Sequence, residues 1–474
     1  MRNKYILRED TKTITRIAES LLEVLILTVL YYLVWRYGYE KENFPAYFGN
    51  GKYVLMGVYG FLTYILTQNT DGFQFGNLRR MDLALAQWIA LLLVNCITYF
   101  QLSLIANKMV SVLPILLLMV VQLPLTAMLI TLYAALYHKL YAPHDMIMVY
   151  GSKNAVGLKI KMDRRYDKYN INAMISVSEG YEAICQEVMK HQAVVINDVP
   201  AEIRNDLLKF CYENKIRTYV VPKISDLLMR GATDITVFDT PMVMVKGTGL
   251  SPANRFFKRA MDIIICLIAC IVAAPIMLVV AIAIKLEDGG PVFYTQKRAT
   301  RDCKEFDILK FRSMIVDAEK EGHSIPATGA DPRITRVGRI IRATRIDELP
   351  QILNILKGDM SIVGPRPERL EHIVKYSEEI PEFAYRLKVK GGLTGYAQIY
   401  GKYNTSAYDK LRLDLMYIEN YSLLMDIKLI LMTVRIMLSK DSPEGFEKTE
   451  ELERLTEEVI QNEEKKDSQE EVLL

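Results

Sequence analysis

The sequence contains few cysteines, six in 474 residues, and no two of them form a C-x-x-C pair. They are scattered along the chain, and three lie in or beside apolar runs. Neither a disulfide framework nor a zinc site is therefore expected. We interpret the cysteines as small buried apolar residues and expect the catalytic parts to face a reducing compartment. The six are Cys96, Cys185, Cys211, Cys266, Cys270 and Cys303.

The first apolar stretch lacks the features of a cleavable secretory signal. Glu19 and Glu23 interrupt it, and no small-residue cleavage site follows. We therefore expect this stretch to be a membrane helix and not a signal that is removed.

The middle of the chain lacks the G-x-G-x-x-G fingerprint of dinucleotide-binding domains. Residues 141–250 alternate strand candidates with helical stretches, which is typical of a Rossmann-like α/β domain. The turn after the first strand has Gly151 and Gly157, but Lys153 stands where the middle glycine belongs. A structural or regulatory role is therefore favoured over nucleotide binding. The strand candidates are "MIMVY", "INAMISV", "AVVINDV", "IRTYVVP" and "ITVFDT".

Acidic residues gather at the C-terminus, where residues 441–474 contain 13 acids and 4 bases. Without this tail the net charge rises from +3 to +12. A basic body favours anionic partners such as phosphates, nucleic acid or an acidic membrane surface. The tail itself is either a helix with Leu452, Leu455 and Val459 on one face or a disordered segment.

Hydrophobic residues make up 51% of the chain, and four apolar segments fill residues 1–140. Each is near the ~20 residues that cross a bilayer, although the second is short. No polar face accompanies them, so a soluble bundle of buried helices is less favoured. Bases precede the first segment, Arg79 and Arg80 follow the second and Lys139 follows the fourth, so the positive-inside rule makes both ends of this domain cytoplasmic. The segments are residues 16–35, 53–67, 83–104 and 110–137.

A fifth apolar stretch, residues 263–284, has bases on both sides. A full crossing would carry the basic region that follows to the outside, against the positive-inside rule. Ala274 and Pro275 lie at its middle, where proline removes an amide donor and kinks a helix. We predict a re-entrant helix hairpin that enters one leaflet and returns, with an ordinary kinked span as the alternative.

Candidate catalytic residues are concentrated in residues 251–440. On an α-helix, arginines at every third position drift by about 60° per step, so five of them cannot face one ligand. We expect one or two to reach a substrate and the others to face lipid headgroups or solvent; a wholly solvated basic face is the alternative. The five are Arg333, Arg336, Arg339, Arg342 and Arg345.

Two adjacent carboxylates, Asp347 and Glu348, follow these arginines. Asp347 precedes a short helical pattern that ends at Gly358, so we expect it to cap that helix. The positive helix end and the neighbouring arginines favour an ionised carboxylate, which can attack phosphorus and form an acyl phosphate. Glu348 offers a hard oxygen ligand for Mg²⁺.

More cations lie near these acids in the sequence. Arg366 belongs to a Pro-Arg-Pro turn that begins at Pro365, and the two prolines hold its backbone stiff. A cis peptide bond is compatible with this turn. Lys310 and Arg312 lie on a predicted strand, and Arg298 precedes it. Two polyanions cannot approach each other without such cations, so the arrangement favours phosphoryl transfer.

From residue 258 to about residue 439, the chain resembles the bacterial sugar transferase family, the monotopic polyprenyl-phosphate phosphoglycosyl transferases. The whole chain, with four spans and a Rossmann-like domain ahead of the catalytic domain, is similar to the large subgroup typified by the O-antigen galactose-1-phosphate transferase. The stretches that carry the resemblance are "KRAMDIIICLIACIVAAPIM", "GGPVFYTQKR", "DILKFRSM", "RITRVGRIIR", "IDELPQILNILKGDMSIVGPRPE", "GGLTGYAQIYGK" and "LDLMYIENYSLLMDIKLILMTV".

The resemblance implies a reaction. Family members move a sugar-1-phosphate from a UDP-sugar to undecaprenyl phosphate at the cytoplasmic face of the bacterial inner membrane, releasing UMP, with Mg²⁺ and by a ping-pong route. This is the first membrane step of exopolysaccharide, capsule or O-antigen synthesis. The resemblance makes Asp347 the nucleophile, Glu348 its metal-binding partner, and Arg342 and Arg366 phosphate ligands. It also implies a homodimer, and no nucleic acid is expected as a partner.

The chain departs from the family pattern at three places. The usual Pro-Gly-Leu/Ile-Thr-Gly near the C-terminus is Gly391-Gly392-Leu393-Thr394-Gly395 here. The break in the re-entrant helix, often Ser-Pro, is Ala274-Pro275 here, which removes one hydroxyl–backbone contact. A Gly-Arg pair near the C-terminus becomes Gly401-Lys402, which keeps the charge but loses the bidentate guanidinium.

Two other classes of function stay open. A nucleotide-sugar epimerase or dehydratase centred on residues 145–250 would use a Tyr-x-x-x-Lys pair, and Tyr219 and Lys223 have that spacing. Pro222 and the strand-like "YVVP" argue against it, because the pair would not share a helix face. A non-catalytic membrane scaffold would use the arginines only to bind anionic lipid. No residue indicates which sugar is carried.

Overall fold

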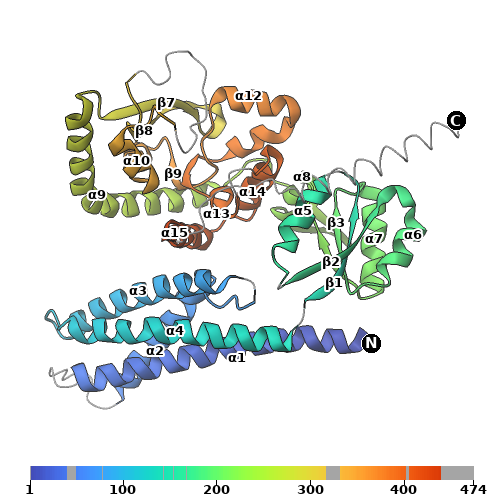
Figure 1. The fold of residues 1–474 in the computed structure, drawn as a ribbon, viewed down its shortest axis with the longest axis horizontal. Coiled ribbons are helices and arrows are strands. Elements are labelled where there is room, and N and C mark those ends of the chain that lie inside the picture. The colour runs from blue at the N-terminus through green and yellow to red at the C-terminus, as the bar shows by residue number, and fades with distance from the viewer. Residues whose placement is uncertain are drawn as a thin grey trace. The chain divides into compact units, whose positions relative to one another are not determined.

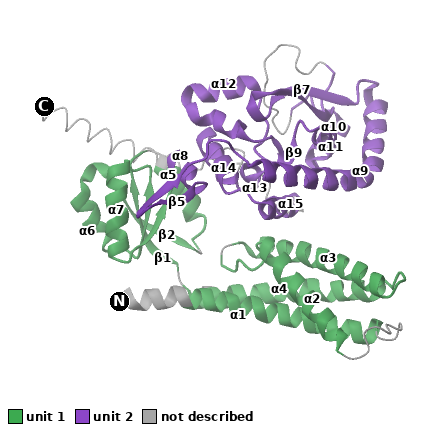
Figure 2. Ribbon diagram, turned by 180° about the vertical axis from the view of Figure 1, so that it is seen from behind, with its two compact units in different colours: residues 1–222, 446–474 green, residues 223–445 purple. Residues whose placement is uncertain are grey.

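The structure is a computed structural model, and it describes residues 2–39, 50–76, 78–141, 143–152, 154–166, 168–316, 331–401 and 405–438. The acidic tail at residues 441–474, together with Lys153 and Lys402, lies outside the described residues. The chain divides into two compact units, with residues 1–222 in the first and residues 223–445 in the second (Figure 2).

Four helices at the start of the chain pack against one another as a bundle (Figure 1). Aromatic side chains fill the space between them, and the rings of Tyr31 and Tyr59 stack with their centroids 4.1 Å apart. The helices are α1 (Arg2–Val34, continued by a π-helical turn at Trp35–Tyr39), α2 (Gly51–Asn69), α3 (Arg80–Ile105) and α4 (Leu113–Leu140).

Polar side chains inside the bundle satisfy one another. Asn95 donates to Gln122 at 2.9 Å, Gln122 donates to the Tyr59 hydroxyl at 2.7 Å, and that hydroxyl donates to Asn95 at 3.1 Å. Such a closed triangle avoids the cost of leaving polar groups unpaired in an apolar interior.

Among the described helices, four are long and apolar enough to cross a bilayer, which identifies a membrane protein. The segment predicted as a short second span forms α2 but is not one of the four, because Lys52, Thr63, Thr67 and Gln68 lower its apolar content. The four candidates are Thr11–Tyr39, Arg80–Ile105, Leu113–Tyr137 and, in the second unit, Pro252–Asp288.

The rest of the first unit contains a parallel sheet of four strands in the order β2-β1-β3-β4. Every residue of β3 is buried, as expected for a strand covered on both faces. Helices connect successive strands, which is the pattern that parallel pairing requires. The strands are β1 (His144–Tyr150), β2 (Tyr169–Ser176), β3 (Ala193–Asn197) and β4 (Arg217–Val220), and the helices are α5 (Asn154–Asp163), α6 (Tyr181–Val188) and α7 (Ala201–Glu213).

The fifth strand candidate of the middle segment, "ITVFDT", does not join this sheet. It contributes to β5 (Thr233–Val237), which pairs with β6 (Thr240–Met244) as an antiparallel hairpin in the second unit. Phe238 has a positive φ of 55° in the two-residue turn, which is the backbone geometry of tight hairpins.

The described part of the second unit contains two apolar clusters, and in the larger one Val363, Phe383, Leu411 and Leu415 are fully buried. Its elements are α8 (Ile224–Arg230), α9 (Pro252–Asp288), β7 (Phe293–Ala299), β8 (Glu305–Phe311), α10 (Arg336–Ala343), η6 (Ile346–Glu348), α11 (Gln351–Lys357), β9 (Ser361–Val363), α12 (Leu370–Glu379), η7 (Pro381–Lys388), β10 (Gly392–Thr394), α13 (Tyr396–Tyr400), α14 (Ala407–Glu419) and α15 (Leu423–Leu438). Strands β7 and β8 pair antiparallel, and β9 and β10 pair parallel.

Helix α9 contains the fifth apolar stretch and bends sharply along its length (Figures 1 and 2). The sequence predicted a break at Ala274-Pro275, but the helix is continuous through both residues. Pro275 removes one amide donor and crowds the preceding turn, which is enough to bend a helix without ending it.

Buried charges attach the start of α9 to the core of the second unit. The Lys258 amine donates to Asp426 of α15 at 2.6 Å and to the Tyr417 hydroxyl of α14 at 3.0 Å. Asp262, one turn later, accepts from the Ser361 hydroxyl of β9 at 2.8 Å. These contacts tie the apolar helix to the elements that carry the candidate site.

Lys258→Met is expected to lower the free energy of unfolding by about 3–5 kcal/mol, because it leaves Asp426 buried without its cation. Denaturant unfolding of the purified protein in detergent measures this loss. Lys297→Met is the matched control: Lys297 pairs with Glu305 at 3.4 Å but is 72% exposed, so a loss under about 1 kcal/mol is expected. Equal losses in the two variants would contradict the anchoring role of Lys258.

Candidate active site

Asp347 and Glu348 lie in a single 3₁₀ turn, η6, between α10 and α11. Arg345 has a positive φ of 56° immediately before the turn, which lets the chain reverse there. The sequence predicted that Asp347 caps α11, and this prediction is wrong. The residue that caps α11 is Pro350, with no side-chain cap bond, because three residues separate Asp347 from the helix start.

Helix α11 is fixed to strand β8 through one side chain. The carboxamide of Asn354 accepts from the Leu309 amide at 2.9 Å and donates to the Asp307 carbonyl at 2.8 Å. Asn354 therefore pairs with the strand backbone as a neighbouring strand would. This contact places the turn with the two carboxylates beside β8.

The end of α11 agrees with the sequence prediction. Gly358 adopts a left-handed φ of 99° and ends the helix. The terminal carbonyls accept from two cations, since Arg259 of α9 donates to Leu356 at 2.7 Å and Lys390 donates to Gly358 at 2.5 Å. The negative end of the helix dipole favours cations at this position.

Glu348 is the centre of the ionic cluster. One of its oxygens, Oε1, accepts from Lys310 of β8 at 2.7 Å and from Arg366 of the Pro-Arg-Pro turn at 2.7 Å. Its side chain is only 14% exposed. Burial raises the pKa of Glu348, but the charges and hydrogen bonds of Arg366 and Lys310 outweigh burial and hold this pKa well below the usual range.

Asp347 has the opposite electrostatic environment. Burial raises its pKa above the ordinary aspartate value, with a further increase from the charge of Glu348, and Lys310, Arg342 and Arg366 offset only part of that. The sequence predicted that the helix end and the neighbouring arginines would favour the ionised form of Asp347. That expectation left out the desolvation of a side chain inside the fold.

The structure distributes the five periodic arginines over different surroundings. Arg342 lies close enough to act on Asp347, and Arg345 lines a groove beside Glu348. Arg333 forms an ion pair with Asp331 at 2.6 Å. The remaining two, Arg336 and Arg339, are exposed.

The Pro-Arg-Pro turn is held by the backbone of β10. The Pro365 carbonyl accepts from the Gly392 amide at 2.9 Å, and the Gly364 amide donates to Thr394 at 2.8 Å. A Cβ on Gly392 would lie 2.1 Å from the Gly364 nitrogen, so this approach requires glycine. No cis peptide bond occurs in the described residues, so both Pro bonds of the turn are trans.

A buried cation supports the turn from behind. Arg386 is 3% exposed; it donates to the Arg366 carbonyl at 3.0 Å and pairs with Asp414 at 2.9 Å and with Glu368 at 3.6 Å. Burial raises the pKa of Asp414 to about 6, against the attraction of Arg386. Sequence reasoning missed Arg386 and Asp414, because neither belongs to a local pattern of charge.

The other two predicted phosphate ligands lie outside the ionic cluster. Arg298 contacts the rear of the Pro-Arg-Pro turn, through the Pro367 carbonyl at 3.5 Å. Arg312 is buried and pairs with Asp288 at the end of α9. Lys310 and Arg312 are two positions apart, and only Lys310 reaches the carboxylates.

An apolar groove begins at the ionic cluster. Its cavity volume is about 500 Å³, within the range of small-molecule sites. Glu348, Arg345 and Arg366 line it together with apolar side chains of α11 and the turn before it, of β9 and β10, and of α13 and α15. The apolar side chains include Leu349, Ile352, Ile399, Ile430, Val434 and Met437.

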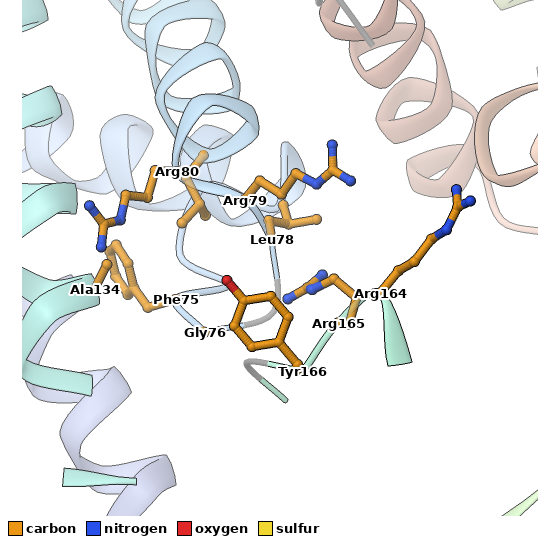
Figure 3. Close-up of a pocket in the computed structure, with 10 residues that line it drawn as sticks. Phe75, Gly76, Leu78, Arg79, Arg80, Ala134, Arg164, Arg165 and Tyr166 are labelled. Atoms are coloured by element: carbon orange, nitrogen blue, oxygen red, sulfur yellow. The ribbon is translucent and has the colours of Figure 1, made fainter. Parts of the chain in front are cut away.

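A second pocket lies in the first unit and holds arginines but no carboxylate (Figure 3). Arg79 and Arg80 line it with Arg164 and Arg165. Figure 3 shows the guanidinium groups of Arg79 and Arg80 pointing to opposite sides, so they do not converge on one ligand. Since no carboxylate lines this pocket, the candidate active site is the cluster around Glu348.

The donor set suits a magnesium ion shared with a substrate. The described residues contain no cluster of three or more histidine, cysteine or carboxylate side chains. Mg²⁺ is commonly held by one or two carboxylates with the remaining ligands from substrate phosphates and water. Glu348 is the carboxylate that could hold such an ion, and the adjacent cations disfavour a metal that arrives without phosphate.

The bacterial sugar transferase profile matches residues 253–440, which contain this whole site. A UDP-N-acetylgalactosamine-undecaprenyl-phosphate N-acetylgalactosaminephosphotransferase of Aeromonas hydrophila is 44% identical over 192 residues, 40% of this chain and 45% of the relative. A UDP-glucose:undecaprenyl-phosphate glucose-1-phosphate transferase of Escherichia coli K12 is 40% identical over 211 residues, 44% of each chain.

A shorter relative is matched along most of its length. The exopolysaccharide production protein PSS of Rhizobium leguminosarum bv. phaseoli is 41% identical over 185 residues, which are 37% of this chain and 92% of the relative. The chain belongs to the bacterial sugar transferase family. It spans about half the length of the first two relatives.

The raised pKa of Asp414 predicts a pH dependence of stability. The folded chain retains a proton that the unfolded chain releases between about pH 4 and pH 6, so stability should fall as pH rises through this window. The free energy of unfolding of the wild type should fall by on the order of 2 kcal/mol across this window because of Asp414, and Asp414→Asn should abolish that fall. Urea unfolding at pH 4.5 and pH 6.5 measures the difference.

Asp302→Asn is the control, because Asp302 is 78% exposed. It should leave the pH dependence as in the wild type. An unchanged dependence in Asp414→Asn would show that Asp414 does not titrate in this range.

Proposed function

We propose that the protein transfers a sugar-1-phosphate from a UDP-sugar to undecaprenyl phosphate through a covalent aspartyl-phosphosugar. The reaction would be the first membrane step of exopolysaccharide, capsule or O-antigen synthesis. The observation that carries the proposal is a half-buried carboxylate, Asp347, beside an ion-paired carboxylate and three cations, next to an apolar groove. The names of the relatives support undecaprenyl phosphate as acceptor.

In the first step an oxygen of Asp347 attacks the sugar-bearing phosphorus of the UDP-sugar. An acyl-phosphate bond forms, and the bond between that phosphorus and the bridging oxygen breaks, so UMP leaves with the electron pair. Lys310, Arg342 and Arg366 neutralise the negative charge that gathers around phosphorus. Hydrogen bonds to Glu348 hold Lys310 and Arg366 in place before the substrate arrives.

In the second step a phosphate oxygen of undecaprenyl phosphate attacks the same phosphorus. The bond to Asp347 breaks, the carboxylate is regenerated, and the product is the undecaprenyl diphosphate sugar. A Mg²⁺ ion held by Glu348 and substrate phosphates would supply further charge neutralisation. Glu348 keeps its own charge throughout, because its pKa lies far below physiological pH.

The membrane arrangement belongs to the same proposal. Bases beside the apolar helices favour the bacterial inner membrane with the second unit on the cytoplasmic side. The bend of α9 and its flanking bases favour a helix that enters and leaves one leaflet. The parallel sheet of the first unit suits a Rossmann-like module with a structural or regulatory role, and homodimerisation stays a prediction.

The epimerase alternative is less well supported. Tyr219 lies on β4 and Lys223 caps the start of α8, so the two do not share a helix face. The scaffold alternative gives Asp347 no special role, and this separates it from the proposed transferase.

Asp347→Asn is expected to reduce UMP release from UDP-sugar and undecaprenyl phosphate by about 10³-fold or more, because an amide cannot act as the nucleophile. A panel of UDP-sugars identifies the donor in the same assay. Asp359→Asn, a change of the same kind beyond α11, should stay within about three-fold of the wild type. A rate in Asp347→Asn above a tenth of the wild-type rate would exclude Asp347 as nucleophile.

The raised pKa of Asp347 predicts the acid limb of the pH–rate profile. The ionised carboxylate is the reactive form, so activity should fall as pH drops through a pKa above 3.8. Lys310→Met removes a charge that lowers this pKa, and the acid limb should move to still higher pH. Lys304→Met, on an exposed lysine, should leave the limb in place. A limb that does not move in Lys310→Met would contradict the assigned coupling.

A further inference from the structure

Helix α1 carries two carboxylates inside the membrane bundle, and we call Glu19 and Glu23 the membrane carboxylates. Glu19 is 6% exposed and Glu23, one turn later, is 1% exposed. The next residues at this spacing, Leu27 and Tyr31, are also buried. The two acids therefore lie on the face of α1 that packs against α2 and α4, and not on a lipid-facing side. Ionisable groups inside a membrane span are rare and commonly mark a functional site.

The membrane carboxylates have too few donors and too little positive charge around them. Both oxygens of Glu19 and the Oε2 oxygen of Glu23 are buried and accept no hydrogen bond from the described residues. The charged groups that act on the pair are the two acids themselves and Arg16, one turn before Glu19. Two ionised carboxylates thus face one cation in an interior of low dielectric constant, where an unpaired charge is costly. One positive charge is missing.

Two other buried side chains also indicate a ligand at this place. Gln87 of α3 reaches Glu23 and is 1% exposed. Its nitrogen donates to the Gly72 carbonyl at 3.0 Å, but its oxygen has no donor in the described part of the chain. Tyr133 of α4 is 5% exposed and lies close enough to interact with both membrane carboxylates, and its buried hydroxyl has no partner there either. Four acceptor oxygens and one hydroxyl therefore adjoin one another without donors.

A metal cation satisfies these groups better than a proton does. A proton on one carboxylate serves at most two of the four acceptor oxygens, the one that carries it and the one that accepts from it. A metal cation can contact several oxygens at once, and carboxylate and amide oxygens are ligands that hard cations prefer. Because one positive charge is missing, the cation that fits is monovalent.

We propose that Glu19, Glu23 and Gln87 bind a monovalent metal cation, such as Na⁺, inside the membrane bundle. Tyr133 offers its hydroxyl oxygen as a further ligand. The bound cation supplies the missing charge and ties α1 to α3 and α4, so it stabilises the bundle. None of these residues belongs to the candidate active site, and the inference does not depend on the proposed function.

The chain offers a local probe for this test. Its two tryptophans, Trp35 and Trp88, both lie in the membrane bundle, so tryptophan emission reports the unfolding of the bundle and not of the second unit. The experiment uses the full chain in detergent without divalent cations. Replacing choline chloride with NaCl at constant ionic strength should raise the unfolding temperature by about 3–6 °C. Radiolabelled Na⁺ should bind saturably, with one ion per chain, and Glu23→Gln should remove both effects.

Glu202→Gln is the matched control, because Glu202 is an exposed acid of the same unit. It should keep Na⁺ binding and the stabilisation by Na⁺. Asp347→Asn should keep both as well, which separates this site from the candidate active site.

Absence of saturable Na⁺ binding to the wild type would overturn the inference, whether or not Glu23→Gln folds. Full Na⁺ binding in Glu23→Gln would overturn it too. A bundle whose unfolding temperature responds to pH but not to Na⁺ would show that the carboxylates hold a proton instead. Stabilisation by Ca²⁺ and not by Na⁺ would contradict the monovalent assignment.

Discussion

The arrangement of the candidate site depends on one carboxylate oxygen shared by two cations. Glu348 accepts from Lys310 and Arg366 at 2.7 Å each, and these residues come from a strand, a 3₁₀ turn and a proline-rich turn. Removing either cation would leave Glu348 buried with less compensation, so the three elements are held in one geometry. Asp347 precedes Glu348 directly and is placed by the same contact.

Two adjacent acids acquire different properties from their surroundings. The pKa of Glu348 is low because two cations touch it, and the pKa of Asp347 is raised because burial outweighs more distant charges. Sites that use two neighbouring carboxylates for different tasks typically raise the pKa of one and lower the pKa of the other. Here Glu348 holds the cations, and the proposed function assigns the covalent chemistry to Asp347.

Local patterns were enough to predict much of the fold. The sequence indicated the apolar helices, four strands of the parallel sheet, the strand that carries Lys310, and the end of α11 at Gly358. It could not show that Arg312 turns away from Lys310 to meet Asp288, nor that Arg386 and Asp414 lie behind Arg366. Those contacts join residues that are far apart in the chain. The raised pKa of Asp347 likewise comes from tertiary burial, which no local spacing reveals.

The central claim is that Asp347 becomes covalently bound to phosphorus. Intact-protein mass spectrometry after incubation with a UDP-sugar and no acceptor lipid tests it most directly, followed by peptide mapping of the acid-quenched chain. The account predicts an added mass of one sugar phosphate on the peptide that contains Asp347, removed by hydroxylamine. UMP release without any such adduct, or an adduct on another residue, would contradict it.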